Sequence, residues 1–125
     1  MQINKTILVV EDDPQVRQLL CSFLRRLGYE ARTASDGATA LGLVRTAAPD
    51  LVLLDVDLPD GSGFDLCRAI KSSPDLASIP IVFCTGRDTH EDREIAAQVG
   101  DADYLAKPFD LRELAECLRR HLPKP

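Results

Sequence analysis

Hydrophobic positions along this chain follow two patterns that alternate from one end to the other. Short runs in which every residue is apolar are typical of strands buried on both faces. Stretches with apolar residues three or four positions apart are typical of amphipathic helices. The first pattern, with one alternating segment, predicts strands at residues 7–10, 29–34, 51–54, 81–84 and 104–106. The second predicts helices at residues 14–27, 36–47, 91–99 and 111–122, and another after the loop at 59–63.

Capping signals mark the ends of two of these helices. Asp13 is a good N-cap and Pro14 a good first helical residue, while Gly28 ends the first helix. Asp110 caps the last helix, with Glu113 at the capping-box position. The core-facing stripe is expected to be Val16, Leu19, Leu20, Phe23, Leu24 and Leu27 in the first helix, and Leu111, Leu114, Ala115, Leu118 and Leu122 in the last.

Regular alternation of strands and helices predicts a parallel sheet with helices on both faces. The first, third and fourth strands are the most apolar and should be central. The second strand contains Glu30 and Arg32, and the fifth is short, so both should be edges. The predicted fold is therefore α/β and flavodoxin-like: a doubly wound, five-stranded parallel sheet in the order 2-1-3-4-5, with five helices on two faces.

Composition places the chain among ordinary globular domains. Of its 125 residues, 45% are hydrophobic and 28% are charged. The formal net charge is −5 and the basic residues are scattered, which argues against direct nucleic-acid binding by this domain. No segment approaches the ~18 apolar residues of a membrane helix, and no signal-type stretch is present. We therefore predict a cytoplasmic protein without membrane contact.

The cysteines and histidines show no motif spacing. The cysteines lie inside apolar patterns without a CxxC pair, which predicts small buried hydrophobic residues in a reducing compartment. They are Cys21, Cys67, Cys84 and Cys117. His90 and His121 lie near helix ends, where we expect them to be solvated.

Acidic residues follow the predicted strands at one edge of the sheet, where ligands of open α/β sheets bind. The side chains delivered there are those of Glu11, Asp12, Asp13, Asp55, Asp57, Thr85 and Lys107. Several converging carboxylates repel one another and need a cation, and oxygen ligands of this kind favour Mg²⁺. A carboxylate is also able to accept a phosphoryl group. Asp55 directly follows four apolar strand residues, where burying an acid without a purpose is costly.

Four segments together resemble the receiver domain of two-component response regulators. They are Val-Val-Glu-Asp-Asp-Pro (9–14), Leu-Val-Leu-Leu-Asp-Val-Asp-Leu-Pro-Asp-Gly (51–61), Phe-Cys-Thr-Gly (83–86) and Asp-Tyr-Leu-Ala-Lys-Pro-Phe (103–109). The match covers nearly the whole chain in the family's order and spacing. Residues 1–125 are accordingly predicted to be one receiver domain, with an ordered core at about 4–122.

The resemblance implies an acceptor and a metal site. Asp55 would be the phosphoacceptor, receiving its phosphoryl group in a Mg²⁺-dependent transfer. Glu11 and Asp12 would be the acidic pair that holds Mg²⁺ together with Asp55, and the backbone carbonyl of Asp57 would be a further metal ligand. Asp13 has a simpler interpretation as an N-cap.

The resemblance also implies a switch. Thr85 would bond a phosphoryl oxygen and Lys107 would pair with the phosphoryl group, with a cis Lys107–Pro108 peptide bond. Tyr104 stands at the family's switch aromatic position and would turn inward when Thr85 moves. Asp57 and Arg87 lie two residues after Asp55 and Thr85, and a salt bridge between them over the pocket is a hypothesis for a longer phosphate lifetime.

The implied partners follow from the same family. A histidine kinase or phosphotransfer protein would donate the phosphoryl group, and a fused or separate effector would read it through the fourth helix, fifth strand and fifth helix. Candidates for ion pairs across a homodimer on that face are Arg93, Asp103, Arg112 and Glu113. The match to dimerising receivers is partial, since Cys117 stands where they usually carry Arg. A receiver of this kind is not a turnover enzyme.

Two rival interpretations remain at this stage. A phosphorylation-independent pseudo-receiver would bind partners as its whole function, although the acceptor and metal residues are intact. A Mg²⁺-dependent phosphatase of the haloacid-dehalogenase type would also use an Asp-x-Asp motif such as Asp55-Val56-Asp57, but after the first strand of a larger domain. Asp60 and Gly61 are interpreted as turn residues rather than ligands.

Overall fold

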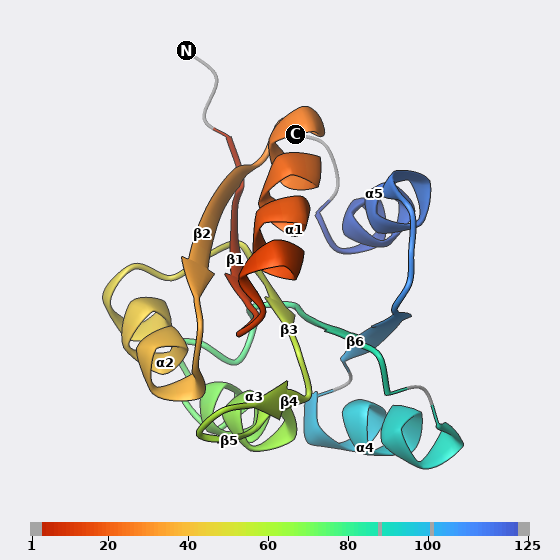
Figure 1. Ribbon diagram of the computed structural model, residues 1–125. Coiled ribbons are helices and arrows are strands. Elements are labelled where there is room, and N and C mark those ends of the chain that lie inside the picture. Colours follow the sequence, from red (N-terminus) through yellow and green to blue (C-terminus); the bar gives the residue numbers. More distant parts are fainter. Residues whose placement is uncertain (1–3, 88, 101, 123–125) are drawn as a thin grey trace.

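A five-stranded parallel sheet in the order β2-β1-β3-β6-β7 forms the centre of the molecule (Figure 1). The computed structural model describes residues 4–87, 89–100 and 102–122. The strands are β1 (Thr6–Val10), β2 (Glu30–Ala34), β3 (Leu51–Leu54), β6 (Ile81–Thr85) and β7 (Asp103–Ala106). This order confirms the prediction, because these strands are the first to fifth of the sheet along the chain.

Helices cover both faces of the sheet. One face packs against α1 (Pro14–Arg26) and α5 (Leu111–His121), and the other against α2 (Gly37–Thr46), α3 (Gly63–Lys71) and α4 (His90–Gly100) (Figure 1). Successive side chains of a strand point to opposite faces. In β1, Ile7 and Val9 therefore pack toward α1 and α5, whereas Leu8 and Val10 pack toward α2 and α3.

The aliphatic core explains why the apolar runs become central strands. Every residue of β1 from Ile7 onward and every residue of β3 and β6 is buried. Burying one Leu, Ile or Val side chain contributes about 1.5–3 kcal/mol, so each central strand is stabilised on both faces. The edge strand β2 keeps an exposed Glu30, as its alternating pattern predicts.

Two helices begin at the N-cap residues that the sequence predicts. Asp13 accepts a hydrogen bond from the amide of Gln15, and Asp110 forms the predicted capping box with Glu113. The expected stripe of α1 is wrong at one position: Leu19 is 53% exposed, because only the side containing Leu20, Cys21 and Leu24 reaches the core.

A short antiparallel hairpin replaces part of the predicted loop before α3. It consists of β4 (Asp57–Leu58) and β5 (Gly61–Ser62), and Gly61 has a φ of 151°. Between these strands, the carboxylate of Asp60 accepts hydrogen bonds from the amides of Gly37 and Ala38, at 2.8 and 3.0 Å. Asp60 thus lies in a turn, as predicted, and also binds the exposed start of α2.

The cysteines and histidines are placed as follows. All four cysteines are buried and free, in agreement with the prediction. His90 is exposed, as expected, whereas His121 is only partly solvated: its side chain is 26% exposed and its Nε2 lies 3.0 Å from Asp103. Within the described residues, no helix combines the length and the apolar character that crossing a membrane requires.

Candidate functional site

Strand register brings the predicted polar residues together at the carboxyl edge of the sheet. Val10 pairs with Leu54, so the next residues, Glu11 and Asp55, are neighbours. The amide of Asp55 donates to the carbonyl of Val10 at 3.1 Å. On the other side, the amide of Lys107 donates to the carbonyl of Thr85 at 2.9 Å. Adjacent parallel strands that end in line therefore place these side chains at one point.

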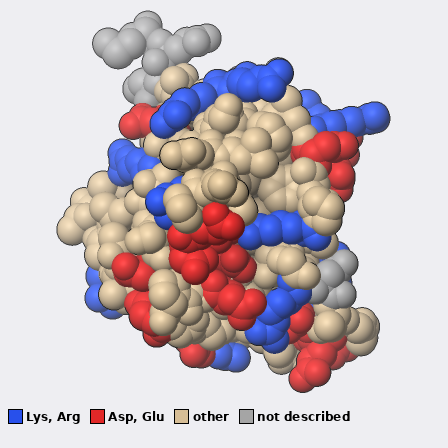
Figure 2. All heavy atoms as spheres, viewed as in Figure 1, with Lys and Arg blue, Asp and Glu red and all other residues tan. Residues whose placement is uncertain are grey.

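Three carboxylates and one ammonium group form the centre of the site. Carboxylate oxygens of Glu11, Asp12 and Asp55 lie within 4.8 Å of one another. Glu11 is 3% exposed and Asp55 is 9% exposed, while Asp12 is open to solvent. Lys107 forms an ion pair with Glu11 and lies 3.4 Å from an oxygen of Asp55. Figure 2 shows acidic side chains gathered in the middle of this face, with Lys and Arg around them.

The site contains more negatively charged groups than positively charged ones. Burial raises the pKa of Glu11, against the lowering effect of the Lys107 hydrogen bond. Burial also opposes the charge of Lys107, but its hydrogen bond to Glu11 and the negative charge of Asp55 outweigh this and raise its pKa. One ammonium group faces two buried carboxylates and a solvent-exposed one, so the ionised cluster keeps a net negative charge that suits a divalent cation.

The oxygen donors fit Mg²⁺ rather than a softer metal. Mg²⁺ is bound by one or two carboxylates and keeps several waters. Glu11, Asp12 and Asp55 supply the carboxylate oxygens. Asp12 is exposed, so the cluster is open to solvent at this residue. The amide of Asp57 lies 3.3 Å from the Asp55 oxygen that does not face Lys107, and this bond holds the loop after β3 beside the acidic cluster.

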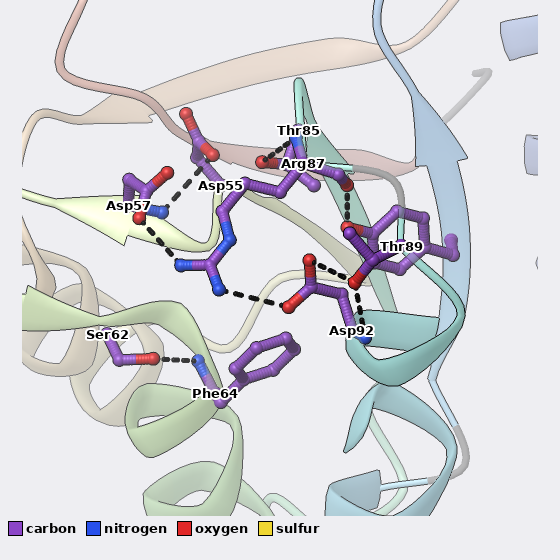
Figure 3. Close-up of polar contacts among 9 residues, drawn as sticks. Asp55, Asp57, Ser62, Phe64, Thr85, Arg87, Thr89 and Asp92 are labelled. Atoms are coloured by element: carbon purple, nitrogen blue, oxygen red, sulfur yellow. Dashed lines mark hydrogen bonds and ion pairs between the residues drawn. The ribbon is translucent and has the colours of Figure 1, made fainter. Parts of the chain in front are cut away.

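Thr85 and Tyr104 both contact the backbone of Arg87. Figure 3 shows the contact between Thr85 and Arg87. The buried hydroxyl of Thr85 accepts from the amide of Arg87 at 3.3 Å. Tyr104 is 9% exposed, packs against Phe83 with ring centroids 6.3 Å apart, and donates its hydroxyl to the carbonyl of Arg87. The loop after β6 is thus held by Thr85 and Tyr104, the two residues for which the family resemblance implies a role in a conformational switch. The Lys107–Pro108 peptide bond is cis, as the resemblance implies.

The guanidinium of Arg87 lies between two carboxylates (Figure 3). It is 3.1 Å from Asp57, which confirms the predicted salt bridge, and 3.0 Å from Asp92 on α4. Asp92 also accepts from the hydroxyl of Thr89 at 2.9 Å, and its amide donates back to that hydroxyl at 3.0 Å. Sequence reasoning missed Asp92 and Thr89, although a Thr three residues before an acid at a helix start is a capping signal.

Gly63 is a further residue that sequence reasoning did not single out. It begins α3 close to the backbone of Asp55, and its amide donates to the carbonyl of Val56 at 2.7 Å. A Cβ at this position would overlap the backbone carbonyl oxygen of Asp55. Only glycine allows the two backbone segments to approach this closely. The Gly-rich composition of the loop was the only signal available.

Comparison with known proteins gives a consistent result. The sequence profile of the family described as "Response regulator receiver domain" matches residues 7–119. The transcriptional regulatory protein GltR of Pseudomonas aeruginosa is 43% identical over 111 residues, which cover 89% of this chain and 46% of that protein. The chain spans about half the length of the curated relatives it matches.

Solved structures agree with the sequence comparison. The chemotaxis protein CheY4 of Vibrio cholerae has a TM-score of 0.90 at 31% identity, and the match covers 96% of this chain and 100% of that one. The receiver domain of a sensor histidine kinase of Pseudomonas aeruginosa, described with a magnesium ion coordinated in its active-site cleft, has a TM-score of 0.89 at 34% identity. That match covers 98% of this chain and 100% of the other.

Proposed function

This chain belongs to the response regulator receiver domain family, and from that membership we propose that it is a signalling switch in which Asp55 accepts a phosphoryl group from a phosphohistidine donor. The carrying observation is the position of Asp55. It directly follows the central strand β3 at 9% exposure, with Lys107 3.4 Å from one carboxylate oxygen and the amide of Asp57 3.3 Å from the other. Its carboxylate is oriented from both sides and still meets solvent.

Mg²⁺ would be held by Glu11, Asp12, Asp55 and the backbone carbonyl of Asp57. The convergence of the three carboxylates supports this ligand set. When bound there, Mg²⁺ would neutralise negative charge on the carboxylate and phosphoryl oxygens. Glu11 is fixed for this role by its ion pair with Lys107 and by the amide of Asp13, which donates to its other oxygen at 3.2 Å.

The chain's own residues position and neutralise the transferred group. A carboxylate oxygen of Asp55 attacks phosphorus, so that a P–O bond forms while the P–N bond of the donor breaks and the imidazole leaves. The ammonium group of Lys107, already beside Asp55, pairs with a phosphoryl oxygen. The Thr85 hydroxyl, which now accepts from the amide of Arg87, donates to another phosphoryl oxygen.

The loop after β6, which contains Arg87, would also transmit the signal to the output surface. Tyr104 is bound to the carbonyl of Arg87, so a shift of Thr85 toward the phosphoryl group moves the backbone that positions Tyr104. We assign readout to the surface of α4, β7 and α5, contacted by a fused or separate effector. On that surface Asp103 pairs with Arg120, and Arg112 pairs with Glu116, within one chain. A homodimer through this surface would exchange some of these pairs for contacts between chains.

Several broader expectations belong to this proposal. Residues 1–125 form one receiver domain with an ordered core at about 4–122, and residues 1–3, 88, 101 and 123–125 lie outside the described residues. The donor is a histidine kinase or a phosphotransfer protein, and the protein works in the cytoplasm without binding nucleic acid or membrane through this domain. It gains and slowly loses its own phosphoryl group and does not turn over a substrate. Asp55 follows the third strand along the chain, which disfavours the phosphatase interpretation.

Intact mass after incubation with acetyl phosphate and Mg²⁺ tests the proposal, with Asp55→Asn as the matched control. One added phosphoryl group is expected on the wild type, and none on the variant or after EDTA treatment. An adduct that persists in Asp55→Asn would refute the acceptor assignment. No adduct together with undetectable Mg²⁺ binding would favour the pseudo-receiver, in which partner binding is the whole function.

A further inference from the structure

A second group of metal-ligating side chains lies at the opposite end of the sheet from Asp55. Asp103 is the first residue of β7, and Cys117 and His121 face it from α5. The Nε2 atom of His121 is 3.0 Å and the Sγ atom of Cys117 is 3.8 Å from the same carboxylate oxygen of Asp103. One ligand atom from each residue lies within 4.8 Å of the other two.

Helix geometry brings two of these donors to one face. Cys117 and His121 are four residues apart in α5, and side chains at this spacing lie one above the other. The neighbouring strand adds the carboxylate of Asp103, whose Oδ1 accepts from the backbone N–H of Tyr104 at 2.8 Å. This bond fixes the carboxylate through the oxygen that Cys117 and His121 do not contact. The three donors are therefore preorganised by two different elements.

The donor set has the chemistry of a zinc site. Thiolate sulfur, imidazole nitrogen and carboxylate oxygen are the ligands that Zn²⁺ takes in proteins, at about 2.0–2.3 Å. A tetrahedron with such bonds has ligand atoms about 3.3–3.8 Å apart. The observed separations of 3.0 and 3.8 Å already approach these values. Mg²⁺ would not choose this set, because it prefers oxygen ligands.

Burial leaves the cluster accessible from one side. Cys117 is 1% exposed, whereas the side chains of Asp103 and His121 are 30% and 26% exposed. An ion would reach the cluster past these two residues, and a water molecule would fill its fourth position. Arg120, which pairs with the same oxygen of Asp103 at 3.0 Å, has a side chain that is 58% exposed. It is able to release Asp103 and remain hydrated, so no charge is left buried alone.

We propose that Asp103, Cys117 and His121 form a second metal site, selective for Zn²⁺ and ions of similar ligand preference. The metal–sulfur bond forms as the thiol proton leaves to solvent, and His121 binds through its neutral ring. A metal bound there links β7 to the end of α5, on the surface that the proposed function uses for output. The site shares no ligand with the acidic cluster around Asp55, so each stands or fails independently.

Titration of the untagged 125-residue chain with Co²⁺, followed by competition with Zn²⁺, tests this site. A visible d–d spectrum with a near-ultraviolet sulfur-to-metal band is expected, and Zn²⁺ should abolish it. Cys117→Ser should remove the sulfur band, and His121→Gln should weaken Co²⁺ binding about tenfold or more. Cys21→Ser, which changes another buried cysteine on α1, should leave the spectrum unchanged, and Asp55→Asn should retain the sulfur-to-metal band.

Several outcomes would overturn the proposal. They are the absence of a sulfur-to-metal band in the wild type, a band retained in Cys117→Ser, unchanged affinity in His121→Gln, and a band lost in Asp55→Asn. Circular dichroism checks that the variants fold. His121→Gln is the safer variant because its side chain is partly exposed. A thermal shift with Zn²⁺ that disappears in His121→Gln gives a second, independent readout.

Discussion

The guanidinium of Arg87 lies 3.1 Å from the carboxylate of Asp57 and so ties the loop after β6 to the loop after β3, beside the proposed acceptor Asp55. The same guanidinium reaches Asp92, which is only 5% exposed on α4 (Figure 3). Through these two ion pairs, Arg87 connects the loop after β3 with α4, a helix of the proposed output surface. The amide of Asp57 lies 3.3 Å from a carboxylate oxygen of Asp55, and we therefore propose that the Arg87–Asp57 pair shields an acyl phosphate on Asp55 from water.

Arg87→Ala should shorten the lifetime of the phosphorylated state, because water then reaches the phosphoryl group more easily. The substitution removes the ion pairs with both Asp57 and Asp92. Only the exposed pair with Asp57 lies beside Asp55, and a pair of this kind is worth about 0.2–1 kcal/mol, so the expected acceleration is up to about fivefold. The measurement is the decay of the phosphorylated mass after the donor is removed. Arg45→Ala, which changes an exposed arginine on α2, is the control and should decay at the wild-type rate. Unchanged decay in Arg87→Ala would count against the shielding role.

Asp92 predicts a specific dependence of stability on pH. The hydrogen bond from Thr89 is the main influence that lowers the pKa of Asp92, and Arg87 lowers it further. A carboxylate whose pKa is lower in the folded state stabilises the fold above its unfolded pKa of about 3.9. This contribution is lost as the pH falls through the lower, folded pKa.

Urea unfolding of wild type and Asp92→Asn at several pH values measures this contribution. At pH 7 the variant should be the less stable protein, and the difference should shrink as the pH falls below about 3.9. The measurement is made in EDTA so that metal binding does not contribute. A difference that stays constant down to pH 2 would show that the charge of Asp92 does not stabilise the fold.

Gly63→Ala should harm both the fold and the acceptor. The new methyl group would overlap the carbonyl oxygen of Asp55, and the backbone must shift, at a cost of about 1–3 kcal/mol for an overpacked site. The displaced Asp55 should also accept phosphoryl groups more slowly. Gly42→Ala is the matched control, because a Cβ there has no atom within 4 Å and alanine favours a helix by about 0.5–1 kcal/mol. Equal stability of the two variants would contradict the close approach.

Sequence patterns predicted the sheet and the convergence of the acidic residues for one physical reason. Continuous apolar runs identify central strands, and the residue after each run must then lie at the carboxyl edge. The neighbourhood of Glu11 and Asp55 follows from this register alone. The strand order was predicted from the contrast between these apolar runs and the second strand, in which Glu30 and Arg32 indicate an edge position that water reaches.

Features that depend on side-chain torsions or on very short elements were not predictable in this way. The hairpin of β4 and β5 has two residues in each strand, too few for a period to appear. The exposure of Leu19 depends on how far α1 rolls on the sheet, which its apolar spacing does not specify. The bond between Arg87 and Asp92 joins a loop to a helix through a long side chain, and no sequence period encodes such a contact.

Lys107→Ala should strengthen Mg²⁺ binding while it slows phosphorylation. Lys107 now neutralises Glu11 and Asp55, so its removal leaves two buried carboxylates without their cation and raises the negative charge that meets the metal. Even in water, two unit charges about 4 Å apart interact by about 1 kcal/mol, which corresponds to a several-fold gain in Mg²⁺ affinity. Calorimetric titration measures the affinity, with Lys5→Ala, a change at an exposed lysine, as the control. Phosphorylation by acetyl phosphate should nevertheless be slower, because the phosphoryl oxygens lose their ammonium partner. Weaker Mg²⁺ binding in Lys107→Ala would show that Lys107 orients the carboxylates more than it competes with the metal.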